Sequence, residues 1–231
     1  MIRVINFSGG HTSALMTILL KPTDKDIVLF TDTLREHPGT YQFIDEFQKH
    51  ENIKVHYAVH PLGWNKFKKG LPNRTRRSCT EDLKINTAKK YLRTLGIQKF
   101  ENYIGFRADE KHRIINRKQY FKKVIDKFPL DELGIIKYDV DQYWNAKPYK
   151  LTIPRILGNC DCCFLKGKAA IIRILQHNPD LADKWISDEE RTGHTFIKGV
   201  TYKQLKLLSQ QQLKLFSLDE ITPAFNCSCT T

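Results

Sequence analysis

The segment Ser8–Ser13 constrains the fold of this chain most strongly, because two glycines join an apolar run to a helical pattern. An apolar run over residues 2–7 is followed by Ser8, Gly9, Gly10, His11, Thr12 and Ser13. A strand that ends at glycines and restarts as a helix brings the backbone close to a ligand. Its amide N–H groups and the positive end of the helix then face an anion. The segment therefore predicts a phosphate-binding loop; the alternative is an ordinary strand-to-helix turn.

Strand and helix patterns alternate through the first half of the chain at the spacing of βαβ units. Strands are predicted over residues 3–7, 26–31, 54–59, 102–106 and 135–138, and helices over residues 12–20, 38–50 and 79–95. Further helices are predicted over residues 168–177, 188–191 and 202–216. We expect an α/β fold with a doubly wound, mostly parallel sheet over residues 1–155. A small helical, cysteine-bearing C-terminal region is expected over residues 156–231.

The composition favours a globular chain with anionic partners. Of the 231 residues, 41% are hydrophobic and 27% are charged, and the formal net charge is +13. Such a charge favours nucleotides or nucleic acid, although a solvated basic surface is the alternative. Basic residues concentrate over residues 66–77 and 107–123. With no apolar run of membrane-spanning length and no signal-peptide pattern, we expect a cytoplasmic protein without membrane partners, whose cysteines are not in disulfides.

Polar residues follow the second and fourth predicted strands, at the edge where doubly wound sheets bind ligands. After the second strand we expect ribose or phosphate contacts from Thr31, Asp32, Thr33, Glu36 and His37. After the fourth strand, Gly105 would allow close approach of a ligand, and Arg107 and Arg113 would clamp a phosphate or sulfate. The alternatives are a polar capping loop and a plain surface segment.

These segments resemble the PP-loop adenine nucleotide α-hydrolase superfamily. Ser8–Ser13 is similar to its Ser-Gly-Gly-x-x-Ser pyrophosphate loop, and residues 31–43 and 103–113 are similar to segments of the phosphoadenylyl sulfate (PAPS) reductases. Leu34 stands where their first motif has glycine. The run Asn-Cys-x-x-Cys-Phe-Leu-Lys-Gly over residues 159–167 looks like a signature of phage and bacterial members. The resemblance implies that Arg107 contacts nucleotide phosphate, and that Asp109 orients Arg107 or Arg113.

Five of the six cysteines fall in the last 72 residues, which indicates a common task. The spacing of Cys79, Cys160 and Cys163 resembles the cluster ligands of adenylyl sulfate reductases. It implies a 4Fe-4S cluster, with the fourth ligand from Cys162, Cys227 or Cys229. Zinc and plain buried thiols are the alternatives. Cys227 and Cys229 near the C-terminus would suit either a mobile catalytic thiol or a metal ligand.

The resemblance implies a nucleotide enzyme of sulfur chemistry that binds ATP or adenylyl sulfate/PAPS, and the nucleotide would allow Mg²⁺ as a further cofactor. The preserved pyrophosphate loop favours ATP-dependent adenylation and sulfur transfer to an acceptor such as a nucleic acid. A sulfonucleotide reductase that releases sulfite is an alternative. Either reaction would call for a thioredoxin-like reductant or sulfur donor. A second alternative is a non-catalytic nucleic-acid-binding module with a structural zinc.

Overall fold

The computed structural model describes residues 1–117 and 124–211, and its centre is a five-stranded sheet. The strand order is β3-β2-β1-β4-β5, and each neighbouring pair is parallel. The strands are β1 (Ile2–Asn6), β2 (Ile27–Asp32), β3 (Val55–Val59), β4 (Phe100–Tyr103) and β5 (Val124–Lys127). This sheet confirms the predicted doubly wound α/β fold.

Helices connect the strands and form the C-terminal region. With the sheet lie α1 (His11–Leu20), α2 (Pro38–Glu51), α3 (Asn86–Thr94), α4 (Lys111–Ile115), α5 (Pro129–Glu132) and α6 (Lys137–Asn145). The C-terminal region carries α7 (Lys168–His177), α8 (Asp183–Thr192) and α9 (Tyr202–Gln211). A π-helical stretch, Thr80–Ile85, leads directly into α3. Among the described helices, none has the length and apolar character needed to cross a membrane.

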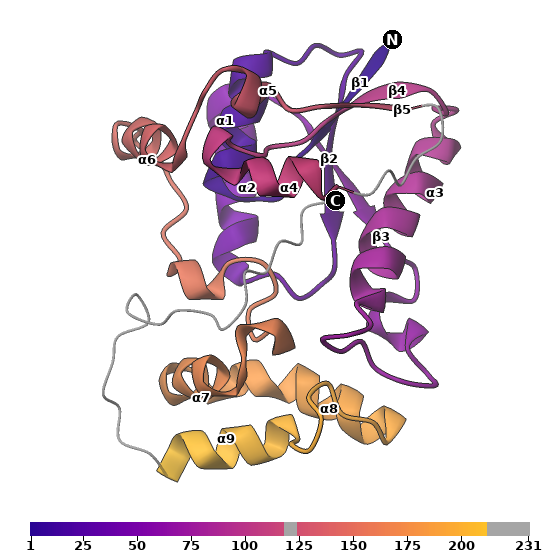
Figure 1. Cartoon of the computed structure of the whole chain (residues 1–231), viewed down its shortest axis with the longest axis vertical. Coiled ribbons are helices and arrows are strands. Elements are labelled where there is room, and N and C mark those ends of the chain that lie inside the picture. Colours follow the sequence, from indigo (N-terminus) through magenta and orange to yellow (C-terminus); the bar gives the residue numbers. More distant parts are fainter. Residues whose placement is uncertain (118–123, 212–231) are drawn as a thin grey trace.

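Both faces of the sheet are buried, because successive side chains of a strand point to opposite faces. In β1, Ile5 packs into a cluster with Phe43 of α2 and Trp144 of α6. Its neighbour Val4 packs on the other face, in a cluster with Leu92 of α3. Figure 1 shows α1 and α2 on one side of the sheet and α3 on the other. The apolar strands thus lie in the middle of a three-layer arrangement, and their carboxyl ends remain open at one edge.

The predicted strand over residues 135–138 is wrong, and the fifth strand is Val124–Lys127. Gly134 has φ +68° and ends the turn that follows α5. The Ile136 N–H then donates a hydrogen bond to the Asp139 carboxylate at 2.9 Å, which caps the start of α6. The apolar residues at this point therefore lead into a helix. The pattern of β5 is hard to recognise in the sequence, because the strand has four residues and two of them are charged.

The C-terminal helices build a core of their own, into which part of the first half of the chain inserts. Trp185 and Tyr202 are buried there with Trp64 and Phe67, which come from the loop after β3. The Arg35 guanidinium lies 4.9 Å from the ring centroids of both Trp64 and Trp185. These contacts tie the loop after β2 to α8. Figure 1 shows α7, α8 and α9 grouped beyond the sheet; the division at residues 155 and 156 stays a prediction.

Candidate functional site

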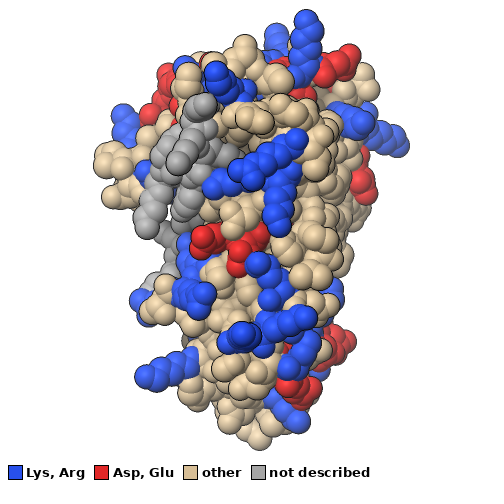
Figure 2. Space-filling view, turned by 90° about the vertical axis from the view of Figure 1, so that its right-hand side faces the viewer, with Lys and Arg blue, Asp and Glu red and all other residues tan. Residues whose placement is uncertain are grey.

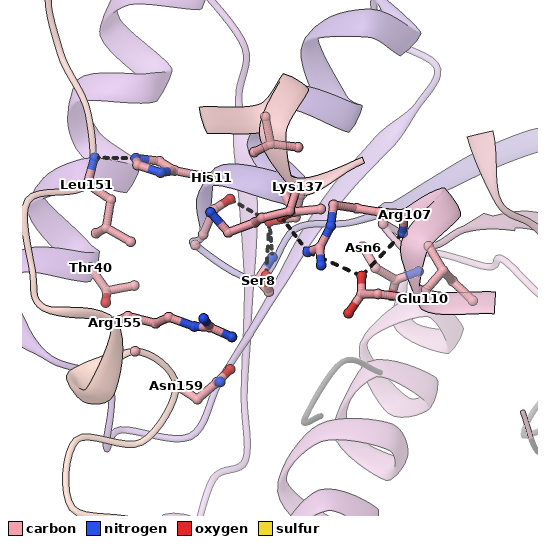
Figure 3. A pocket seen from close by; sticks show the side chains of 18 of the residues that line it. Asn6, Ser8, His11, Thr40, Arg107, Glu110, Lys137, Leu151, Arg155 and Asn159 are labelled. Atoms are coloured by element: carbon pink, nitrogen blue, oxygen red, sulfur yellow. Dashed lines mark hydrogen bonds and ion pairs between the residues drawn. The ribbon is translucent and has the colours of Figure 1, made fainter. Parts of the chain in front are cut away.

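A cavity of about 560 Å³ opens at the carboxyl ends of β1 and β4. Its walls come mainly from four segments: the loop after β1, the residues after β4, the start of α6, and residues 151–159. Figure 3 shows side chains from these segments pointing into the same space. Since parallel sheets bind ligands at this edge, the cavity lies where the sequence predicts a site.

The loop after β1 is held in shape by Gly9 and Ser13. The Ser13 hydroxyl accepts a hydrogen bond from the Ser8 N–H at 3.0 Å, and it lies 3.0 Å from both the Ser8 hydroxyl and the Gly10 carbonyl oxygen. Gly9 has φ +72°, and a Cβ built there would lie 2.6 Å from the Thr40 methyl group. This position therefore requires glycine for both conformation and space.

The first turn of α1 forms the floor of the cavity. Gly10 is the N-cap residue, has an extended conformation, and provides no side-chain hydrogen bond to the helix. His11, Thr12 and Ser13 all line the cavity. Because the first N–H groups of a helix have no partner within it, an anion can bind to these amides and to the positive end of the helix dipole.

His11 connects residues 144–151 to the loop after β1, and its imidazole is uncharged. Its Nε2 accepts a hydrogen bond from the Leu151 N–H at 2.9 Å, and the Trp144 indole N–H donates to its carbonyl oxygen at 2.9 Å. The imidazole stacks on Trp144 with ring centroids 5.0 Å apart. Burial lowers the pKa of His11 to about 4. The ring is therefore uncharged near neutral pH and can serve as the acceptor.

An ion-pair network lies opposite the loop. The Arg107 Nε donates to the Asp109 carboxylate at 2.8 Å, and the same guanidinium lies 3.3 Å from Glu110. Arg113 donates to Glu110 at 2.6 Å and lies over the Phe106 ring. Burial opposes ionisation of Asp109, but the hydrogen bond and the charge of Arg107, together with backbone hydrogen bonds, outweigh it and hold the pKa of the carboxyl below its usual range. The network orients both guanidinium groups in the cavity lining, and it holds Arg107 beside the first turn of α1, 3.5 Å from the Thr12 hydroxyl.

The wall formed by residues 151–159 supplies a further positive charge, Arg155, which is not part of the ion-pair network of Arg107 and Arg113. Arg155, in a short 3-10 helix, is exposed and reaches into the cavity below Ser8 (Figure 3). Among the described residues it forms no ion pair, whereas Lys137 in the same lining is paired with Asp141. Arg155 can therefore meet an anionic ligand without first leaving a carboxylate partner.

The residues predicted after the second strand lie outside this lining. Thr31, Asp32, Thr33 and Glu36 are buried, and His37 caps α2 by accepting from the Gly39 N–H at 3.0 Å. The Thr33 hydroxyl lies 3.6 Å from the Cys160 sulfur, and Glu36 pairs with Cys160 as an antiparallel bridge. This loop thus contacts the cysteine-bearing segment, and its role in nucleotide binding stays a prediction.

Leu34 keeps the backbone path that a glycine would favour. It adopts φ +62°, in the left-handed region. The Asp32 carboxylate accepts a hydrogen bond from the Leu34 N–H at 2.6 Å and another from the Tyr41 hydroxyl at 2.8 Å. These two bonds hold the turn closed. The departure from glycine at this position therefore leaves the turn conformation in place.

The sequence of this site matches a known family. Residues 2–150 match the family model of the phosphoadenosine phosphosulfate reductase domain. The chain belongs to this family. It is 29% identical over 206 residues to the nin region protein ORF290 of Escherichia phage lambda, which covers 74% of this chain and 68% of that protein.

Two archaeal relatives extend the comparison. Proteins MJ0066 and MJ0973 of Methanocaldococcus jannaschii are 29% and 28% identical over 196 and 200 residues. These matches cover 79% and 82% of this chain, but 40% and 48% of the relatives, so the chain spans less than half of their length. The names of these three relatives state no activity. Family membership supports nucleotide-dependent sulfur chemistry without fixing the reaction.

The described cysteines gather at the C-terminal core, without forming a metal site among the described residues. Cys160, Cys162 and Cys163 are buried in the C-terminal core, and Cys79 packs against it. Among residues 1–117 and 124–211, no group of three His, Cys, Asp or Glu side chains has a metal-binding arrangement. Cys227 and Cys229 lie outside the described residues. The described thiols alone therefore do not fit a 4Fe-4S cluster or zinc, and both assignments stay predictions.

Cys162 has the environment of a neutral thiol. It is fully buried among apolar side chains, and its carbonyl oxygen accepts a hydrogen bond from the Tyr202 hydroxyl at 2.6 Å. Burial, reinforced by the nearby Asp161 carboxylate, raises the pKa of this thiol well above its usual value. As described, Cys162 suits packing in the core better than nucleophilic chemistry.

No sequence pattern indicates several of the residues that line the cavity. Arg155 and Lys137 follow no recognised motif, and Glu110 was not assigned although it bridges two arginines. Asn6 also lines the cavity, and its side-chain amide donates to Asn102 of β4 at 2.7 Å. A side-chain amide at the carboxyl end of β1, two residues before Ser8, is the signal that could have found Asn6.

Proposed function

We propose that this protein uses ATP to adenylate an acceptor and then replaces the adenylated oxygen with sulfur. The family supports sulfur chemistry on an adenine nucleotide as the coarser assignment. The observation that carries the finer proposal is the loop Ser8–Ser13, whose uncapped helix start lines the cavity together with Arg107 and Arg155. Backbone amides and guanidinium groups are the donors that hold polyphosphates, so a site of this kind favours ATP.

In the proposed reaction, an oxygen of the acceptor attacks the α-phosphorus of ATP. The bond from this phosphorus to the bridging oxygen breaks, and pyrophosphate leaves with the electron pair. Hydrosulfide from a sulfur-donor protein then attacks the adenylated carbon, the carbon–oxygen bond breaks, and AMP leaves. No electrons are gained or lost overall. The amides of the loop would hold pyrophosphate, and Arg107 would offset charge at the α-phosphate.

The family favours sulfonucleotide reduction as a second candidate. A cysteine thiolate would attack the sulfur of adenylyl sulfate or PAPS, and the nucleotide would leave as its 5′-phosphate. A thiol of a thioredoxin-like reductant would then attack the cysteine sulfur and displace sulfite. The disulfide formed accounts for the two electrons. Cys227 and Cys229, the predicted catalytic thiols, lie outside the described residues.

Product identity separates these candidates. The full chain is incubated in parallel with ATP and Mg²⁺, with adenylyl sulfate and with PAPS, each with hydrosulfide, dithiol and a nucleic-acid acceptor. We expect pyrophosphate and AMP from ATP, with sulfur incorporated into the acceptor. Sulfite from either sulfonucleotide would establish the reductase instead, and no product from any of them would support a non-catalytic module. Metal and sulfide analysis of an anaerobic preparation distinguishes a 4Fe-4S cluster from zinc.

A further inference from the structure

A second surface of the molecule carries concentrated positive charge. Two neighbouring hollows of about 300 and 620 Å³ lie between α3 and residues 66–78, and they share Lys66 and Asp82. The basic residues of their linings are Lys66, Lys68, Lys69, Arg76, Lys89, Lys90 and Arg93, against Asp82 as the one acidic lining residue. We name these seven residues the basic face. Figure 2 shows Lys and Arg side chains gathered over the middle and lower part of this side.

The backbone beneath the basic face is anchored from inside. Trp64 and Phe67 are buried in the C-terminal core, so the exposed Lys66 and Lys68 point to the outside of the same segment. The Arg191 guanidinium donates to the carbonyl oxygens of Trp64 and Phe67 at 3.2 and 3.3 Å. Because these bonds hold the backbone of the loop, its ordering would add little to the entropy cost of binding a ligand.

Three positive charges lie close together on α3. Lys89 and Arg93 lie four residues apart, and like charges at this spacing repel each other on one helix face. Lys90 adds a third charge beside them. Lys66 and Asp82 form an ion pair, with the Lys66 Nζ 3.6 Å from an Asp82 carboxylate oxygen. Lys68, Lys69 and Lys90 are exposed beside them, so the lining carries more positive than negative charge, and an anionic partner would relieve the repulsion.

The extent and chemistry of the basic face indicate the kind of anion. It spans two hollows and two elements, which is more than one nucleotide needs. Phe67, the one Phe, Tyr or Trp side chain of the two linings, is buried, and the exposed ring that remains is the imidazole of His194. The face therefore presents mainly charge, with little aromatic surface on which bases could stack. We propose that the basic face binds the sugar-phosphate backbone of a nucleic-acid duplex, whose bases are already stacked inside. That this duplex is the sulfur acceptor rests on the proposed function. The binding of a duplex to the basic face does not depend on it.

The test is duplex binding by the full chain in the absence of ATP. A labelled duplex of about 20 base pairs is titrated by fluorescence anisotropy between about 50 and 200 mM salt. With about four phosphate contacts, affinity should fall about 100-fold over this range. Lys68→Glu/Lys69→Glu should weaken binding by at least about 10-fold and lower the salt slope by about 2.

The matched control reverses the same number of charges elsewhere. Lys25 precedes β2 and Lys203 lies on α9; both are exposed, and neither lines the two hollows. Lys25→Glu/Lys203→Glu should change duplex affinity by less than about threefold, because neither charge belongs to the proposed contact. All variants should retain the wild-type melting temperature.

The inference would be overturned by equal losses in the two double variants, by no duplex binding at the lowest salt, or by tighter binding of polyglutamate than of duplex. DNA and RNA duplexes are separate arms, and a single strand that binds better than both would also contradict it. The proposed function is tested apart from this, because ATP binding is measured by calorimetry on the wild type and on the Lys68→Glu/Lys69→Glu variant with no acceptor present. Absence of duplex binding in a wild type that binds ATP would overturn only the basic face, whereas absence of ATP binding would overturn only the proposed function.

Discussion

Replacing Gly9 with alanine tests why the loop after β1 needs glycine. A left-handed conformation such as φ +72° costs a non-glycine residue about 1 kcal/mol. The added Cβ would also lie 2.6 Å from Thr40 Cγ2 and 3.2 Å from Ile44 Cδ1. Forcing a methyl group into such a packed site costs about 1–3 kcal/mol more. We therefore expect Gly9→Ala to lower the free energy of unfolding by about 2–4 kcal/mol.

A double-mutant cycle measured by urea unfolding separates the two contributions. Thr40→Ser removes the methyl group that Cβ would strike, so Gly9→Ala/Thr40→Ser should recover about 1–2 kcal/mol relative to the sum of the single variants. Gly10→Ala is the matched control, because its φ is −116° and its Cβ would meet only Ser8 Oγ at 3.8 Å. It should cost less than about 1 kcal/mol, as expected for alanine at an N-cap. The reasoning is refuted if Gly9→Ala is as mild as Gly10→Ala, or if the single losses simply add.

Three further predictions concern the cavity and the loop beside it. Arg155→Met should weaken ATP binding by about 10- to 100-fold in calorimetric titration, because a charge-assisted hydrogen bond is lost. Lys203→Met on α9 is the control and should leave the affinity unchanged. Equal affinities of the two variants for ATP would show that Arg155 is not part of the site. His11 has a pKa of about 4 when folded and about 6.5 when unfolded, so stability should be full above pH 6.5 and fall towards pH 4. His11 should account for about 1–2 kcal/mol of this pH-dependent loss in the free energy of unfolding, after allowing for its partial exposure. This loss should be absent in His11→Gln, and identical pH profiles of the wild type and the variant would contradict the prediction. Leu34→Val should lower stability by about 1 kcal/mol, because β-branched residues avoid left-handed φ, whereas Leu34→Asn should not; urea midpoints that do not differ would argue against strain at this turn.

The sequence is most informative where one local signal decides the structure. The glycines after β1 could be assigned because a strand, a turn and a helix start follow one another within a few residues. The same holds for α2, which begins at Pro38 as predicted, and for α7, whose bounds Lys168–His177 agree with the expected range. Each of these features depends on neighbours in the chain, and so its pattern is visible without the fold.

The features that escaped prediction depend on contacts between distant segments. Arg155 lines the cavity because residues 151–159 fold back over the loop, which His11 secures through Leu151. Trp64 joins the C-terminal core although it lies in the first half of the chain. The loop after β2 looked like a ribose-binding segment, but in the structure Glu36 pairs with Cys160. Such pairings carry no periodic signal, because each joins two segments more than a hundred residues apart.

The most direct test of the account is a crystal structure of the full chain with α,β-methylene ATP, in which the bond proposed to break cannot be hydrolysed. We expect the β- and γ-phosphates at the amides of His11, Thr12 and Ser13, with Arg155 within hydrogen-bond distance of a phosphate oxygen. A nucleotide bound with its phosphates away from these amides, or found only on the basic face, would contradict the central claim.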